Sequence, residues 1–547
     1  MTHDGSHDGR MLVSGWKAGL SILVFAIIGA AACTVPDTPE SFHLVAFWRL
    51  PIELPLVALA LLLLPRWMAV PLATLATITV FCLLFLKLAD IGVFAAFQRH
   101  FNPYLDGKML LDGWNLLSGS IGTIGAALAT GLAVVAVIAL IGIFWWACRT
   151  MTRFGRRACR AGVAGSAILL VLGFGLQAAG SKAGVKDIAQ LRGLAYLHDR
   201  LSLVTRSVAD IRAFEGELEA QKGYADGGDL FARIKGRDVV LIFVESYGRS
   251  AIEDPRYGGL IGPRLVRVER QLQAAGFHAA SGWTRSPTVG GLSWLAHGTL
   301  LSGLWIDSQA RYDLLMKSER VSLNRLFREA GWRTAAVMPA ITMDWPEAAY
   351  FGYDQILAAK DLRYRGKPFN WVTMPDQYTL SAFEHLARRP ARDAGKPVMA
   401  EIALISSHAP WTPVPDLIDW AAVGDGTIFN DQAESGDPPA VVWADHDRVR
   451  RHYIETIDYT LETLGDYIAR FGGNAIFVVL GDHQPAALVT GPDASRAVPI
   501  HIISKDATLI DGFRSEGFKI GMTPDAQAPE LSMDIMREQL IRHFSAK

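Results

Sequence analysis

The stretch Val239-Val-Leu-Ile-Phe-Val-Glu-Ser-Tyr-Gly248 is a run of six apolar residues followed directly by a carboxylate. Short continuous runs of this kind, rich in β-branched residues, are typical of strands that are buried on both faces of a sheet. Further runs and helical patterns alternate along the second half of the chain, with strand candidates at residues 334–337, 398–405 and 475–480 and helical patterns at residues 323–330 and 449–471. This alternation predicts an α/β domain with a largely parallel sheet.

Polar side chains follow three of these predicted strands where each strand ends. Glu245 follows the first and His408 follows the third. Asp482 and His483 together follow the fourth. Because ligands bind at the carboxyl ends of strands in such sheets, we expect these side chains to share one edge. Carboxylate and imidazole ligands suit a divalent cation such as Zn, Mn or Mg. Each residue also has a structural alternative: Glu245 alone could cap a turn, and His408 alone could be a loop histidine.

A candidate nucleophile lies in the stretch Thr288-Val-Gly-Gly-Leu-Ser-Trp-Leu-Ala-His-Gly-Thr-Leu-Leu-Ser-Gly303 or just before it. The hydroxyl groups in question belong to Ser286, Thr288 and Ser293. A hydroxyl is a poor nucleophile at neutral pH, and coordination to a metal lowers its pKa. His297 lies one helical turn after Ser293, and we expect it, like Asp307, to have a structural role.

The first part of the chain is strongly apolar. The 547-residue chain is 50% hydrophobic and has a mean hydropathy of +0.22. It is therefore more apolar than an ordinary soluble domain. Apolar segments near the length of about 20 residues that a bilayer requires occur at residues 18–35, 50–65, 67–86, 115–148 and 161–181. We therefore predict a membrane domain of five helices over residues 1–181. The segment 50–65 is the shortest, and its Glu53 is expected to lie near a membrane surface.

The distribution of basic residues predicts how these spans are oriented. With the N-terminus in the cytoplasm, the inner segments hold Arg10, Lys17, Arg66, Arg149, Arg153, Arg156, Arg157 and Arg160. The outer loops hold only Arg49, Lys87, Arg99 and Lys108. By the positive-inside rule, five spans then place the rest of the chain outside the cytoplasm. The predicted location is an inner membrane, with several spans and a periplasmic catalytic domain.

Other features of composition bear on partners and boundaries. The net charge is −1, and no basic stripe with interleaved aromatic residues occurs, so a nucleic-acid partner is not expected. All four cysteines lie in the first 160 residues, which agrees with an oxidising exterior for the remainder. The aromatic segment 89–118 either meets a lipid headgroup or simply anchors the protein. Residues 182–236 are predicted to form an amphipathic helical linker, and residues 237–547 the catalytic domain.

The second half of the chain resembles the sulfatase-like branch of the alkaline phosphatase superfamily. The whole chain resembles the lipoteichoic acid synthase and membrane phosphoglycerol transferase type. In sulfatases the nucleophile stands ten positions before the glycine of an L-L-T-G motif, and Ser293 stands ten positions before the glycine of Leu300-Leu-Ser-Gly303. This spacing selects Ser293 over Ser286 and Thr288. The resemblance implies that Ser293, Glu245, Asp482 and His483 bind the metal and that His408 contacts the substrate.

Departures from the family patterns narrow the expected chemistry. The segment Ser293-Trp-Leu-Ala-His297 lacks the Pro and Arg that formylglycine-dependent sulfatases need, which disfavours sulfate hydrolysis. The synthases use threonine where this chain has serine. Residues 338–345 lack the histidine and arginine with which the synthases hold glycerol phosphate.

The resemblance implies a metal-dependent transferase. It would move phosphoglycerol or phosphoethanolamine from a phospholipid donor to an envelope glycan or lipid acceptor through a covalent Ser293 intermediate. His408 would bind phosphate oxygens or protonate the leaving group. Two alternatives remain: a phosphodiesterase or sulfohydrolase of the same fold, and a pseudoenzyme that binds lipid.

Overall fold

The computed structural model describes residues 13–47, 49–107, 109–183, 189–220 and 230–545. The chain divides into two compact units, Met1–Ala95 with Arg99–Asp210 and Ala96–Gln98 with Ile211–Lys547. The predicted linker 182–236 includes residues 184–188 and 221–229, which lie outside the described residues. Its described part is mainly the long helix α7 (Arg192–Glu219), so the linker boundaries stay a prediction.

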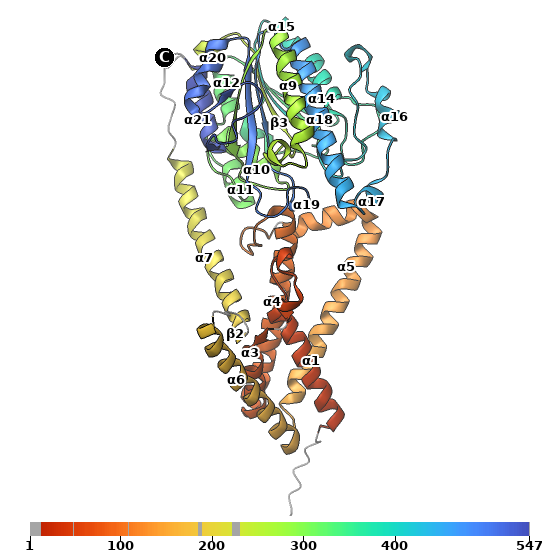
Figure 1. Ribbon diagram of the computed structural model, residues 1–547, viewed down its shortest axis with the longest axis vertical. Helices are drawn as coiled ribbons and strands as arrows, with labels where there is room; N and C mark the ends of the chain where they lie inside the picture. Colours follow the sequence, from red (N-terminus) through yellow and green to blue (C-terminus); the bar gives the residue numbers. More distant parts are fainter. Residues whose placement is uncertain (1–12, 48, 108, 184–188, 221–229, 546–547) are drawn as a thin grey trace, which may run out of the picture. The chain divides into compact units, whose positions relative to one another are not determined.

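The first unit consists mainly of apolar helices (Figure 1). Its long helices are α1 (Gly15–Thr34), α4 (Arg66–Phe97), α5 (Met109–Met151) and α6 (Arg156–Ala183). Four segments of these helices are long and apolar enough to cross a membrane: Gly15–Thr34, Arg66–Phe97, Ile121–Met151 and Arg156–Ala178. Many of their large hydrophobic side chains are exposed, as Leu132 and Val171 are. Lipid rather than water suits such a surface.

The fifth predicted span, residues 50–65, contains the short helix α3 (Glu53–Leu63). Its 11 residues extend about 16 Å at 1.5 Å per residue, whereas a bilayer core is about 30 Å thick. Helix length therefore does not confirm a count of five spans. Glu53 Oε1 accepts hydrogen bonds from Gly193 N at 2.7 Å and Leu194 N at 3.4 Å, so this carboxylate caps the start of α7.

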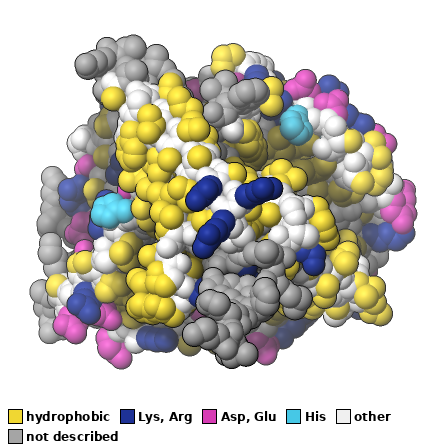
Figure 2. Space-filling view, turned by 90° about the horizontal axis from the view of Figure 1, so that it is seen from below, with side chains coloured by type: hydrophobic (Ala, Val, Ile, Leu, Met, Phe, Trp, Pro, Cys, Tyr) yellow, Lys and Arg dark blue, Asp and Glu magenta, His cyan; other side chains and the backbone are white. Residues whose placement is uncertain are grey.

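The connection between α5 and α6 carries basic side chains. Arg153 in this connection and Arg156 and Arg157 at the start of α6 are exposed. A view from the lower end of the structure shows Lys and Arg side chains close together among many hydrophobic ones (Figure 2). Such a mixture is typical of the cytoplasmic end of a helical membrane domain.

The second unit is built on a nine-stranded sheet with the order β10-β4-β9-β8-β3-β7-β5-β6, in which β11 also pairs with β4. The strands are β3 (Val239–Val244), β4 (His278–Arg285), β5 (Arg333–Met338), β6 (Gln355–Ala358), β7 (Val398–Leu404), β8 (Ile476–Gly481), β9 (Ala497–Ser504), β10 (Lys519–Ile520) and β11 (Glu530–Ser532). The block from β8 to β6 is parallel, whereas β9, β4 and β10 join it by antiparallel pairing. The sheet is thus mixed, with a parallel centre.

Helices cover both faces of this sheet (Figure 1). Alternate side chains of β3 enter two different cores: Val240, Ile242 and Val244 enter one, and Val239, Leu241 and Phe243 enter the other. The first core includes side chains of α9 (Gly258–Ala274), α14 (Asp376–Phe383) and α18 (His446–Phe471), and the second includes side chains of α10 (Ser293–Ser302), α12 (Leu323–Glu329) and α21 (Met533–Phe544). Burial on both faces explains why β3 is a continuous apolar run without alternation.

Candidate active site

The carboxyl ends of β8, β3 and β7 lie side by side at one edge of the sheet. Val244 is in register with Leu404 on one neighbour and Gly481 on the other. Backbone pairing continues one residue further, because Glu245 N donates to Leu404 O (3.1 Å) and Asp482 N donates to Val244 O (3.3 Å). Glu245 and Asp482 therefore follow neighbouring strands at the same level, as the sequence predicts.

Ser293 is the first residue of α10, and the residue before it is held in a left-handed conformation. Leu292 has a φ of +64°, and Ser246, next to Glu245, has a φ of +57°. Left-handed backbone is costly for residues other than glycine, and such strain persists where the surrounding structure imposes it, often at functional sites. The first N–H groups of a helix such as α10 have no i−4 partner within the helix, and this favours a phosphate there.

The Ser293 hydroxyl contacts two of the predicted metal ligands. Its Oγ lies 3.2 Å from Glu245 Oε2 and 3.2 Å from His483 Nε2. His483 Nε2 is also 3.4 Å from Glu245 Oε1 and 3.7 Å from Asp482 Oδ2. The three ligands are buried, whereas Ser293 is partly accessible. The structure thus brings four of the five predicted site residues into one group, in which Ser293 is the most accessible.

Hydrogen bonds fix the orientation of His483 and Asp482. The Nδ1 of His483 lies 2.9 Å from the carbonyl oxygen of Gln484, to which it donates. This bond leaves the Nε2 lone pair for a metal, which is how ligand histidines are commonly held. Asp482 Oδ1 accepts from Ser246 N at 2.8 Å and from His483 N at 2.6 Å, so Oδ2 is the oxygen directed at His483 Nε2.

Two serines that the sequence analysis did not select hold Glu245 in place. Ser246 Oγ donates to Glu245 Oε1 (2.8 Å), and Ser407 Oγ donates to the Glu245 carbonyl (2.6 Å). Both stand next to a predicted site residue, in Glu245-Ser246 and Ser407-His408. That adjacency is the only sequence signal for them, because their partners are set by how the strands pack.

Burial and charge act on the titration of the three ligands. Burial and the charge of Glu245 raise the pKa of Asp482 to about 6. Burial alone would raise the pKa of Glu245, but the positive charge of His483 outweighs it. Burial alone would lower the pKa of His483, but the charges of Asp482 and then Glu245 outweigh it. The pKa of Glu245 is therefore lowered and that of His483 is raised. Without a metal the site retains protons that a bound cation would displace.

The other predicted residue, His408, lies in the turn after β7. It is exposed, and its Nδ1 lies 2.5 Å from the carbonyl oxygen of Ala409. Burial and His483 have the largest effects on the pKa of Glu245. His408 has the next largest, and its positive charge lowers that pKa. His408 is thus within electrostatic range of the ligands, and its role towards a substrate stays a prediction.

The donor set fits a divalent metal. Ligand atoms of Glu245, Asp482 and His483 all lie within 4.8 Å of one another. Two buried carboxylates at that separation need a compensating cation, and one imidazole provides at most one positive charge. Oxygen and nitrogen donors of this kind suit Zn, Mn or Mg, with Ser293 Oγ as a further donor.

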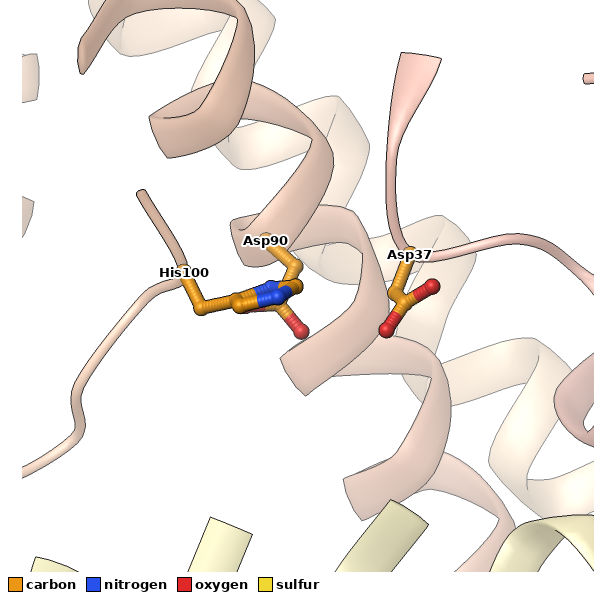
Figure 3. Close-up of side chains that lie close together, drawn as sticks. All are labelled: Asp37, Asp90 and His100. Carbon is orange, nitrogen blue, oxygen red and sulfur yellow. The ribbon is translucent and has the colours of Figure 1, made fainter. Parts of the chain in front are cut away.

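A second set of possible ligands, Asp37, Asp90 and His100, lies in the first unit (Figure 3). These carboxylates already have cationic and hydrogen-bonding partners. Arg200 lies 3.3 Å from Asp90 Oδ1 and 3.8 Å from Asp37 Oδ2, and Phe101 N donates to Asp90 at 2.8 Å. The guanidinium compensates the charge of the buried Asp90, and Asp37 is partly exposed to solvent. This set therefore ties α7 to α4 and is a weaker candidate for a metal site.

Comparisons with known proteins gave matches among solved structures alone: no protein-family model and no curated protein matches the chain. One similar structure is the lipoteichoic acid synthase LtaP from Listeria monocytogenes, at 12% identity over 61% of this chain and 78% of that chain, with a TM-score of 0.38. Another is the phosphoglycerol transferase GacH from Streptococcus pyogenes in complex with sn-glycerol-1-phosphate, at 12% identity over 62% and 80%, with a TM-score of 0.39. The periplasmic domain of EptC from Escherichia coli in complex with Zn matches at 14% identity over 58% and 83%, with a TM-score of 0.37.

Proposed function

We propose that the chain is a membrane-anchored, metal-dependent phosphotransferase that uses Ser293 as its nucleophile. It would transfer phosphoglycerol or phosphoethanolamine from a phospholipid to an envelope glycan or lipid. The observation that carries this proposal is the position of the Ser293 hydroxyl, 3.2 Å from both Glu245 and His483 in a buried group of metal ligands. A serine that had only a structural role would gain nothing from this position.

The residues of the site suggest how a phosphodiester would react. Ser293 Oγ would attack phosphorus while the bond to the diacylglycerol oxygen breaks, and His408 would supply the proton that this oxygen takes. Glu245, Asp482 and His483 would hold a divalent metal, which when bound lowers the pKa of the serine hydroxyl and neutralises charge on phosphoryl oxygens. Backbone N–H groups at the start of α10 would orient the phosphate.

A second displacement would complete the transfer. The headgroup would leave Ser293 when an acceptor hydroxyl attacks the same phosphorus. The apolar helices of the first unit support a membrane location, and a lipid donor suits such a chain. With the N-terminus in the cytoplasm, an odd number of crossings would place the site outside the cytoplasm, which is where an envelope acceptor occurs.

The decisive experiment is mass spectrometry of Ser293 after the full chain, loaded with Mn, has been incubated with headgroup-labelled phosphatidylglycerol or phosphatidylethanolamine. We expect a mass increase on Ser293 equal to one phosphorylated headgroup, and release of diacylglycerol. The Ser293→Ala variant should lose at least about 10³-fold of the donor turnover, because the covalent route is removed. Ser302→Ala, at the other end of the same helix, is the matched control and should retain turnover.

The products separate transfer from its alternatives. Free headgroup without any acceptor adduct would indicate a phosphodiesterase. Donor turnover that survives in Ser293→Ala, or an adduct on another residue, would contradict the assignment of the nucleophile. A chain without stoichiometric metal and without donor turnover would favour a lipid-binding role.

A further inference from the structure

Glu401 is a carboxylate in the middle of an otherwise apolar strand. It stands in Val398-Met-Ala-Glu-Ile-Ala-Leu404, the sequence of β7, and only 1% of its side chain is exposed. A buried carboxylate is costly unless it is paired and hydrogen-bonded. The groups that stabilise the Glu401 carboxylate therefore indicate why a carboxylate occurs in this strand.

The described hydrogen-bond partners of Glu401 are His297, Tyr353 and Asn324. His297 Nδ1 lies 2.6 Å from Oε1, Tyr353 donates its hydroxyl to Oε2, and Asn324 Nδ2 donates to Oε2 at 3.4 Å. Burial and the charge of Glu401 hold the pKa of Tyr353 well above its ordinary value, so this phenol stays a neutral donor. Among these described partners, His297 is the side chain that can carry the compensating positive charge.

The pair with Glu401 determines which nitrogen of His297 is available. Because Nδ1 donates to Glu401, Nε2 is the remaining nitrogen, and an imidazolium carries an N–H there as well. The ring stacks on Phe243, with centroids 3.8 Å apart, and 12% of the side chain is exposed. Phe243 on β3 stands two residues before Glu245, which continues the pairing of that strand through its N–H, so both side chains are on the same face.

The position of His297 on α10 brings it close to the nucleophile. It follows Ser293 by four residues, so their Cβ atoms are about 5–6 Å apart on one helix face. Helical side chains also lean towards the N-terminus of the helix, which here is the Ser293 end.

We propose that His297, which its pair with Glu401 orients, donates as an imidazolium an Nε2–H hydrogen bond to an oxygen of a phosphoryl group bound at Ser293. This inference rests on the proposed function, because it concerns the same site. It assigns a substrate-contacting role to a residue whose position in the sequence suggests only packing. It also explains why β7 contains a buried carboxylate.

The test is the affinity of the full chain, in detergent and loaded with Mn, for orthovanadate, measured by calorimetry. His297→Ala should weaken binding at least about tenfold, because a charge-assisted hydrogen bond is lost. That variant leaves Glu401 unpaired and can fail to fold, so the double variant His297→Gln with Glu401→Gln provides a neutral, hydrogen-bonded replacement. It should fold, keep its Mn and still bind vanadate about tenfold more weakly.

Controls separate this role from packing. Tyr353→Phe removes a neutral donor to the same carboxylate but leaves the pair with His297, and His278→Ala changes an exposed histidine of β4. Both should bind vanadate within about threefold of the wild type. Equal vanadate affinity in the folded double variant and the wild type would overturn the inference, as would a wild type that binds no vanadate.

Turnover of labelled phospholipid distinguishes failure of this inference from failure of the proposed function. If vanadate binding depends on His297 but no headgroup is released, the histidine contact stands and the lipid donor is wrong. If headgroup transfer proceeds and the double variant performs as well as the wild type in both assays, the histidine contact is wrong and the transferase stands.

Discussion

Glu245 and Asp482 are two buried acids whose ligand atoms lie within 4.8 Å of each other. At an effective dielectric constant of about 20, two unit charges at that distance repel each other by about 3 kcal/mol. The raised pKa of Asp482, caused by burial and by Glu245, is the expected response in the absence of a cation. These residues are costly to the fold unless a cation binds, which supports a role in binding a metal.

Removal of metal should lower both stability and activity. Metal at about 100 times its dissociation constant adds about 2.7 kcal/mol to the free energy of unfolding, provided that it binds only the folded state. We expect EDTA to lower the thermal unfolding midpoint of the full chain in detergent, and Mn or Zn to restore it. In Asp482→Asn the metal should shift the midpoint far less, whereas Asp525→Asn, outside the site, should respond like the wild type. An equal metal shift in Asp482→Asn would contradict Asp482 as a ligand.

At the residue scale, the sequence predicted those candidate site residues that directly follow a buried strand, and few others. Glu245, Asp482 and His483 follow buried strands, and parallel pairing alone brings them to one edge. The pair of His297 and Glu401 was not predicted, because it joins a helix to a strand more than 100 residues away. A carboxylate within an apolar strand was the available signal, but it cannot identify the partner.

At the scale of the element, α10 depends on a left-handed residue at each end. Leu292 precedes its first residue with a φ of +64°, and Gly303 follows its last residue with a φ of +66°. Gly303 N donates to Thr299 O at 3.0 Å, which ends the helix in the manner of a glycine C-cap. The ten-residue spacing from Ser293 to Gly303, by which Ser293 was selected, is therefore the length of α10, from its first residue to its C-cap glycine.

Gly303→Ala should be clearly destabilising. A left-handed conformation costs a residue with a Cβ about 1–2 kcal/mol. The added Cβ would also lie 2.9 Å from Cδ of Arg537, a buried residue of α21, so that side chain would have to move. Gly236→Ala is the matched control, because Gly236 has a φ of +77° and open space around it. Thermal unfolding should show a larger loss for Gly303→Ala, and equal losses would mean that contact with α21 contributes nothing.

The strands that were predicted and those that were missed differ in what forms them. β3, β5, β7 and β8 are apolar runs whose burial can be read locally. β4 contains Ser281 and Gly282, and β9 contains Pro499 and His501, none of which favours a strand. Both are formed by pairing within the sheet, and they pair with each other over eight residues, from His278 with Ser504 to Arg285 with Ala497. Pairing between residues so far apart in sequence leaves no local pattern.

At the scale of the whole molecule, the basic residues next to the apolar helices indicate which side of the membrane the second unit occupies. Four long spans are an even number, so without α3 both termini would share one side. The basic residues Arg153, before α6, and Arg156, Arg157 and Arg160, in the first turns of α6, favour a cytoplasmic position for the connection between α5 and α6. The helix after it then leads outwards, whatever the path of α3.

We therefore predict that the second unit faces outwards. Ser435 lies in an exposed loop of this unit, and the Ser435→Cys variant should react with a membrane-impermeant maleimide while the inner membrane is intact, because no bilayer separates reagent and thiol. Arg157→Cys, at the start of α6, is the matched control and should react only after permeabilisation. The wild type, with its four cysteines in the first 160 residues, gives the background. The opposite pattern would place the site in the cytoplasm, away from any envelope acceptor, and would contradict the proposed transfer while leaving the metal site intact.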